Sequence, residues 1–158
     1  MKKAVIIVFP IIFLFGLKSN AQDNSSESNS YVNAVGIKFY PGGITFKHFI
    51  NTKNAVEGLG YFYNRGTRIT ALYEIHNDLP SLEGLRWYVG PGAHVGYFNH
   101  NYGGGIALGV DGVLGLDYKV SEAPINLSLD VQPTLDLGSY SGANRLSIWG
   151  GIGIRYTF

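Results

Sequence analysis

The sequence predicts an all-β chain that forms an eight-stranded antiparallel transmembrane β-barrel, connected as an up-and-down meander. Apolar and polar residues alternate along successive runs, which is the period of a strand with two different faces. Only 15% of the 158 residues are charged, below the ~25% of ordinary soluble domains. Aromatic residues gather near the ends of the runs, as they do where a barrel wall meets the membrane surface.

Residues 1–21 are predicted to be a signal peptide. Lys2 and Lys3 precede an apolar run over residues 4–17, and Ser19 and Ala21 place small residues before a cut after position 21. The alternative is a membrane-anchoring helix, but the run is shorter than the ~20 residues that span a bilayer. Residues 22–30 contain no apolar residue and are predicted to be a flexible leader. Residues 31–158 are then the barrel.

Charge and cysteine content exclude several classes of function. Removing residues 1–21 takes away three lysines, so the formal charge changes from +1 to −2 and leaves no basic excess for binding nucleic acid. The chain has no cysteine, which excludes disulfides and thiolate chemistry. His48, His76 and His100 lie far apart without the spacing of metal ligands. We therefore expect neither a cofactor nor a metal.

The runs of the first half alternate less regularly than those of the second. Residues 35–39 lead into a turn at 41–43. The run 44–50 places Thr45 and Lys47 on one face, and which face of this run points outward is undecided. In the run 55–64, Glu57 shares its parity with apolar residues, so the outward face there is undecided. A bulge near Gly58 or Gly60 could switch it.

Five later runs complete the predicted eight: residues 68–76, 85–97, 106–119, 125–137 and 146–158. The run 125–137 alternates at every position, and Val113 interrupts the run 106–119 mildly. In the last run the even positions from Leu146 to Phe158 are apolar, aromatic or glycine.

Alternation alone does not decide which face points outward, because a soluble lipocalin-like barrel has the same period with its apolar face inside. Here the polar faces hold mostly short side chains and few of the lysines and glutamates of a soluble surface. This favours apolar side chains outside. The aromatic residues expected at the two membrane boundaries are Tyr61, Phe62, Tyr63, Tyr97, Phe98, Tyr118, Tyr140, Tyr156 and Phe158.

Several stretches of the chain resemble small outer-membrane β-barrel proteins of the Bacteroidetes type. They are Gly43–Phe49, Ala71–His76, Trp87–Gly96, Gly109–Lys119, Pro124–Leu137 and Arg155–Phe158, and together they cover nearly the whole chain after the leader. The resemblance implies an eight-stranded barrel in the outer membrane of a Gram-negative cell and brings no assigned activity. It also implies that Phe158 is the signal that the barrel-assembly machinery reads.

The predicted inward set has nearly balanced charge, which suits a network of ion pairs inside a low-dielectric wall. We expect it to plug the barrel; the alternative is a narrow path for ions or water. His94 and Asp111 could also meet as a base and its orienting group, but no serine has a defined spacing from either. The set consists of Lys38, Arg68, Glu74, His76, Arg86, His94, Asp111, Asp117, Asp130, Asp136 and Arg155.

The expected function is that of an integral outer-membrane protein with a filled polar lumen, structural for the envelope, with minor pore activity as an added role. It is not expected to be an enzyme. The alternatives are a lipid-modifying enzyme and a soluble periplasmic lipid-binding barrel. The expected partners are outer-membrane lipid, lipopolysaccharide and the assembly machinery, with the protein a monomer. Turns 51–54, 77–84 and 121–124 are expected in the periplasm, and 41–43, 64–66, 98–104 and 138–144 outside.

Overall fold

The computed structural model describes residues 31–102, 104–137 and 146–158. The predicted signal peptide, the leader, Tyr140 and the 138–144 loop lie outside these ranges. Eight strands and one 3₁₀ turn make up the described chain. They are β1 (Asn33–Phe39), β2 (Gly43–Phe49), β3 (Asn54–Tyr63), β4 (Gly66–Asp78), β5 (Leu85–Phe98), η1 (His100–Tyr102), β6 (Gly105–Lys119), β7 (Ile125–Asp136) and β8 (Leu146–Thr157).

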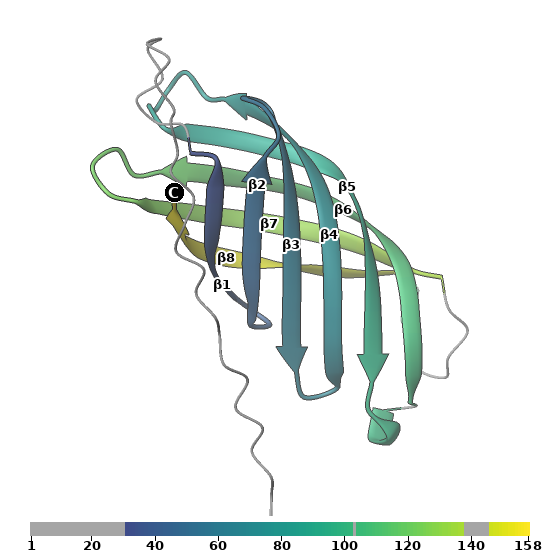
Figure 1. The fold of residues 1–158 in the computed structure, drawn as a ribbon. Coiled ribbons are helices and arrows are strands. Elements are labelled where there is room, and N and C mark those ends of the chain that lie inside the picture. The colour runs from purple at the N-terminus through teal and green to yellow at the C-terminus, as the bar shows by residue number, and fades with distance from the viewer. Residues whose placement is uncertain (1–30, 103, 138–145) are drawn as a thin grey trace, which may run out of the picture.

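The strands form one closed barrel in which each strand pairs antiparallel with its sequence neighbours. Figure 1 shows the strands following one another around the barrel wall. Strands β1 and β2 are shorter than β4 to β8. This confirms the predicted eight-stranded antiparallel barrel. Among the described residues, no helix is long and apolar enough to cross a membrane, a finding that concerns helices only.

The ring closes where β1 pairs with β8, from Ala34 opposite Thr157 to Phe39 opposite Ile152. Beyond this ladder the backbones of Asn33 and Phe158 exchange two hydrogen bonds of 2.9 Å. Because the number of strands is even, the first strand begins and the last strand ends at the same end of the barrel. Successive strands run in opposite directions, so the turns 50–53, 79–84 and 120–124 lie at this end too. We call it the terminal end, and the opposite end, with the turns 40–42 and 64–65 and η1, the distal end.

Strand β3 resolves the parity that the sequence left open. Its pairing with β4 runs without interruption from Asn54 opposite Ile75 to Tyr63 opposite Gly66, so no bulge lies at Gly58 or Gly60. Glu57 points inward with Leu59 and Tyr61. On β2, Thr45 and Lys47 also point inward. The inner face of this region is therefore mixed, with two charged residues beside apolar ones.

The wall has its polar side chains inside and its apolar side chains outside. Exposed apolar residues occur on all eight strands, for example Ile37, Ile69, Leu129 and Ile154. Among the aromatic residues expected at the boundaries, Phe62, Tyr97, Tyr156 and Phe158 are at least half exposed. The expectation was wrong for Tyr61, which is fully buried in the lumen, and Tyr63 packs against Trp149 there as well.

Candidate functional site

The lumen is the place where the polar side chains of the chain meet. Of the residues predicted to face inward, Arg86 and Asp136 are partly exposed at its ends, with side-chain exposures of 16% and 12%. All others are buried: Lys38, Arg68, Glu74, His76, His94, Asp111, Asp117, Asp130 and Arg155. They form two charged groups and an ion pair that stands apart.

The central group contains two cations and three carboxylates, contributed by five different strands. Lys47 Nζ lies 2.7 Å from Glu74 Oε2 and 3.2 Å from Asp117 Oδ2, and 3.6 Å from Glu57 Oε2. The Arg155 guanidinium pairs with Glu57 and lies 4.0 Å from Asp117. All five side chains have 0% or 1% exposure, so no water column passes beside them.

Neutral side chains hold this central group in place. Arg155 Nη1 donates to Asn126 Oδ1 at 3.0 Å, while Asn126 Nδ2 donates to Asp117 Oδ1 at 2.7 Å. Arg155 Nε donates to Thr45 Oγ1 at 3.2 Å, and Thr45 in turn donates to Glu57. Arg155, Asp117 and Glu57 are therefore each held by a neutral side chain as well as by an ion of opposite charge.

The separate ion pair joins β1 to β7. Lys38 Nζ lies 2.7 Å from both oxygens of Asp130. Asp130 also accepts hydrogen bonds from Tyr88 at 2.9 Å and from Gln132 at 3.0 Å. The Gln132 carbonyl accepts one from Tyr61 at 3.0 Å. Two buried tyrosines thereby connect this pair to the apolar cluster of Leu59, Tyr61, Leu72, Tyr88 and Val113.

The distal group is built around His94, whose two ring nitrogens both face carboxylates. Nδ1 lies 2.9 Å from Asp111 Oδ2 and Nε2 lies 2.8 Å from Asp136 Oδ1. Arg68 pairs with the other oxygen of Asp111 and lies over the Trp149 ring at 4.4 Å. Both ring nitrogens of His94 are therefore engaged by carboxylates of the neighbouring strands.

Glycines on the inner face allow side chains two strands apart to meet. Gly109 lies in register between His94 and Asp136, and Gly115 between Tyr88 and Asp130. A Cβ at Gly109 would lie 2.3 Å from His94 Cε1, and one at Gly115 would lie 2.5 Å from Tyr88 Cζ. Since neighbouring strands are about 4.8 Å apart, only an empty middle position lets these pairs form hydrogen bonds.

The terminal end is closed by aromatic and polar side chains. The rings of Tyr31 and Phe49 meet edge to face at 5.0 Å, and Tyr31 Oη donates to Asp117 at 3.0 Å. Burial, followed by the charge of Asp117, raises the pKa of the Tyr31 phenol well above its usual range, so it remains a donor. Arg86 forms an ion pair with Asp78 at 2.9 Å and lies over Phe49.

Sequence reasoning missed several members of the lumen. The outward face of the runs 44–50 and 55–64, which contain Lys47 and Glu57, stays open in the sequence, and Tyr61 is expected there at a membrane boundary. Asn126 and Gln132 did lie on the predicted polar face of the 125–137 run, which was the available signal. Which residues would bond to one another could not be read from alternation, because it depends on the stagger between strands.

The His94 group lacks the geometry of an acyl-transfer site. His94 Nε2, which would activate a hydroxyl, is occupied by Asp136. Ser147 hydrogen-bonds Thr134 and Trp149 instead. In the described part of the chain, no set of three or more His, Asp and Glu side chains is placed to hold a metal ion.

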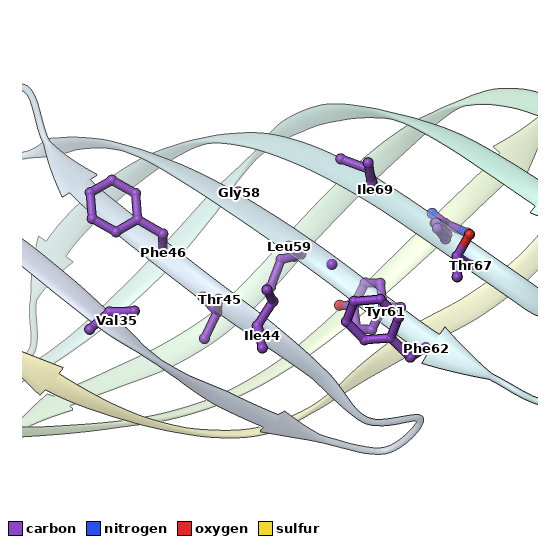
Figure 2. A pocket seen from close by; sticks show the side chains of 12 residues that line it. Val35, Ile44, Thr45, Phe46, Gly58, Leu59, Tyr61, Phe62, Thr67 and Ile69 are labelled. Atoms are coloured by element: carbon purple, nitrogen blue, oxygen red, sulfur yellow. The ribbon is translucent and has the colours of Figure 1, made fainter. Parts of the chain in front are cut away.

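A hollow of about 510 Å³ lies on the outer face of the wall, over β2, β3 and β4. Figure 2 shows Phe46, Ile44 and Ile69 among the residues that line it, with Phe62 nearer the distal end; Phe46 is the residue opposite Gly58. A Cβ at Gly58 would meet nothing within 4 Å, so this glycine leaves open space. The hollow is thus an apolar surface feature that faces away from the lumen.

Comparison of the chain with models of known protein families, with curated proteins and with solved structures gave no match.

Proposed function

We propose that this protein is an integral outer-membrane β-barrel whose filled polar lumen makes it a structural component of the envelope. The observation that carries the proposal is the inverted polarity of the wall. Leu114, Leu129 and Ile152 are more than half exposed in the middle of their strands, while Lys47, Glu57 and Arg155 are buried. Water disfavours both arrangements, and a hydrocarbon surrounding favours both.

The proposed address is the outer membrane of a Gram-negative cell, reached by way of the N-terminal signal peptide. A closed barrel satisfies its backbone hydrogen bonds within the wall, which is what a membrane-spanning sheet needs. A soluble periplasmic lipid-binding barrel, the alternative, needs an apolar cavity inside. The burial of charged side chains in the lumen and the apolar hollow on the outside favour the membrane protein.

The lumen supports a plug better than a pore. Side chains that line an open channel contact water, whereas Lys47, Glu74 and Arg155 have exposures of 0% or 1%. Moving ions past them would require the ion pairs of the central group to separate in a low-dielectric wall, which costs several kcal/mol per ion. We therefore expect minor pore activity at most.

A lipid-modifying activity is the rival from a different class. Its only geometric support is the contact between His94 and Asp111, and Asp136 occupies the nitrogen that would act as the base. Unchanged turnover of membrane lipid in cells that express His94→Ala would agree with a protein that is not an enzyme.

Assembly and partners follow from the same proposal. The exposed wall contacts outer-membrane lipid and, in the outer leaflet, lipopolysaccharide, and the protein works as a monomer. Phe158, which is 60% exposed on the outer face beside Tyr156, serves as the recognition residue for the barrel-assembly machinery.

Electrophoresis of the outer-membrane fraction in SDS, with and without boiling, tests the proposal. A closed barrel resists SDS until it is heated, so we expect a mobility shift for the protein in this fraction. Recovery in the soluble periplasmic fraction, with no shift, would contradict the membrane placement.

A further inference from the structure

The charges of the central group do not balance. Lys47 and Arg155 supply two positive charges, and Glu57, Glu74 and Asp117 supply three carboxylates. All five are at most 1% exposed, so bulk solvent does not screen the excess. An unbalanced charge in such a place is costly enough that the site takes up a compensating ion or proton.

The rest of the described lumen cannot supply the compensation. Lys38 is matched by Asp130. Arg68 and His94 are both engaged by Asp111, and His94 by Asp136 as well, so the distal group has no cation to spare. At the terminal end, Arg86 is committed to Asp78. The excess of one negative charge therefore belongs to the central group.

Two buried oxygen atoms show where the compensation lies. Glu57 Oε2 and Glu74 Oε1 are fully buried and accept no hydrogen bond from any residue that the structure describes. Their carboxyl groups interact with each other, since the two residues are diagonal neighbours on the inner faces of β3 and β4. Two ionised carboxylates in contact repel, whereas one proton between them satisfies both oxygens.

We infer that the lumen binds one proton in its centre, shared between Glu57 and Glu74. With this proton in place the charges of the central group cancel: Lys47 and Arg155 face Asp117 and a single negative charge on the glutamate pair. The titratable and charged groups that face the pair come from seven strands and the segment before β1. They are Tyr31, Lys38 from β1, Lys47 from β2, Tyr61 from β3, His76 from β4, Tyr88 from β5, Asp117 from β6 and Arg155 from β8.

His76 is the nearest alternative holder of the proton. Its Nε2 lies 2.9 Å from Glu74 Oε2, but its Nδ1 is buried without a partner. A proton on Nδ1 would create a buried N–H that nothing accepts, while leaving Glu57 Oε2 and Glu74 Oε1 still in need of a donor. One proton on the glutamate pair gives both of these oxygens a hydrogen-bond partner, so the pair is the favoured site.

Infrared spectroscopy of the folded protein at neutral pH tests this site. We expect the C=O stretching band of a protonated carboxyl group that shifts in D₂O. The band should be lost in Glu74→Gln and in Glu57→Gln, because the new amide donates where the proton did. Glu122→Gln, the same substitution at an exposed turn residue, should leave the band intact.

The wild-type spectrum alone is informative if a variant does not fold. Absence of the band in the wild-type protein would overturn the proposal, as would a band that persists in both lumen variants. Two protonated nitrogens on His76 in a ¹⁵N NMR spectrum, without a carboxyl band, would place the charge on the imidazole instead. Thermal stability that depends on the identity of the monovalent cation, again without the band, would place a metal ion there.

Discussion

At the scale of single residues, the lumen is organised by which positions lack a side chain. Gly109 and Gly115 each lie between two residues on the flanking strands whose side chains form a hydrogen bond across the glycine. The sequence placed these glycines on the polar face but gave no sign of the pairs they permit. Adding a side chain at one of these glycines should therefore lower the stability of the barrel as much as removing one of the two hydrogen-bonding partners.

Gly109→Ala should destabilise the barrel by about 1–3 kcal/mol, because the new Cβ would lie 2.3 Å from His94 Cε1 and 2.4 Å from the backbone oxygen of Leu135, which forces the ring and β7 to shift. Gly58→Ala is the matched control, since its Cβ meets nothing within 4 Å, and should be neutral or slightly stabilising. The free energy of unfolding in urea measures both. Equal effects would show that the His94 contact contributes nothing.

The pair of Lys38 and Asp130 should behave as a buried ion pair. Lys38→Met leaves a carboxylate in the wall without its cation and should cost about 3–5 kcal/mol. Lys38→Met combined with Asp130→Leu should recover part of this loss, because no uncompensated charge remains. A double-mutant cycle on unfolding free energies gives the coupling, and additive losses would contradict it.

At the scale of the strand, alternation predicted the elements whose two faces differ in polarity. Strand β7 alternates along its length, and the sequence assigned both of its faces. Strand β3 could not be assigned, since its inner face holds Leu59 and Tyr61 while its outer face holds Gly58 and Gly60. There, tight packing inside the barrel selects bulky apolar residues, and the pattern no longer reports which side is the lumen.

The destabilisation caused by a charge on the outer face of β7 should depend on how far along the strand the charge lies. If hydrocarbon surrounds the barrel, Leu129→Lys near the middle of the strand should cost about 2–4 kcal/mol, and Ile125→Lys at its start about 0–1 kcal/mol. Unfolding from lipid vesicles measures the difference. A soluble barrel would tolerate both substitutions equally.

At the scale of the whole molecule, the barrel depends on joining its first strand to its last. The sequence predicted the strand number, from which this closure follows for an antiparallel ring. It could not predict the cross-lumen contacts, such as Lys38 with Asp130, because these are set by the stagger of all eight strands together.

Phe158→Ala should separate folding from assembly. The backbone of Phe158 holds Asn33 while its ring contacts only Tyr156 among the described rings, so the purified variant should unfold within about 0.5 kcal/mol of the wild type. In cells, its heat-modifiable band in the outer-membrane fraction should weaken. Tyr156→Ala, on the same face, is the control. Equal accumulation of Phe158→Ala and the wild type would argue against the assembly role.

The pairing of β1 with β8 joins the first strand to be synthesised to the last. Ala34 and its partner Thr157 are about 120 positions apart, so β1 exists long before the strand that will pair with it. During that interval the edge of β1 offers its N–H and C=O groups to any strand nearby. Until β8 pairs with it, that edge is the part of the wall most open to pairing with a wrong strand.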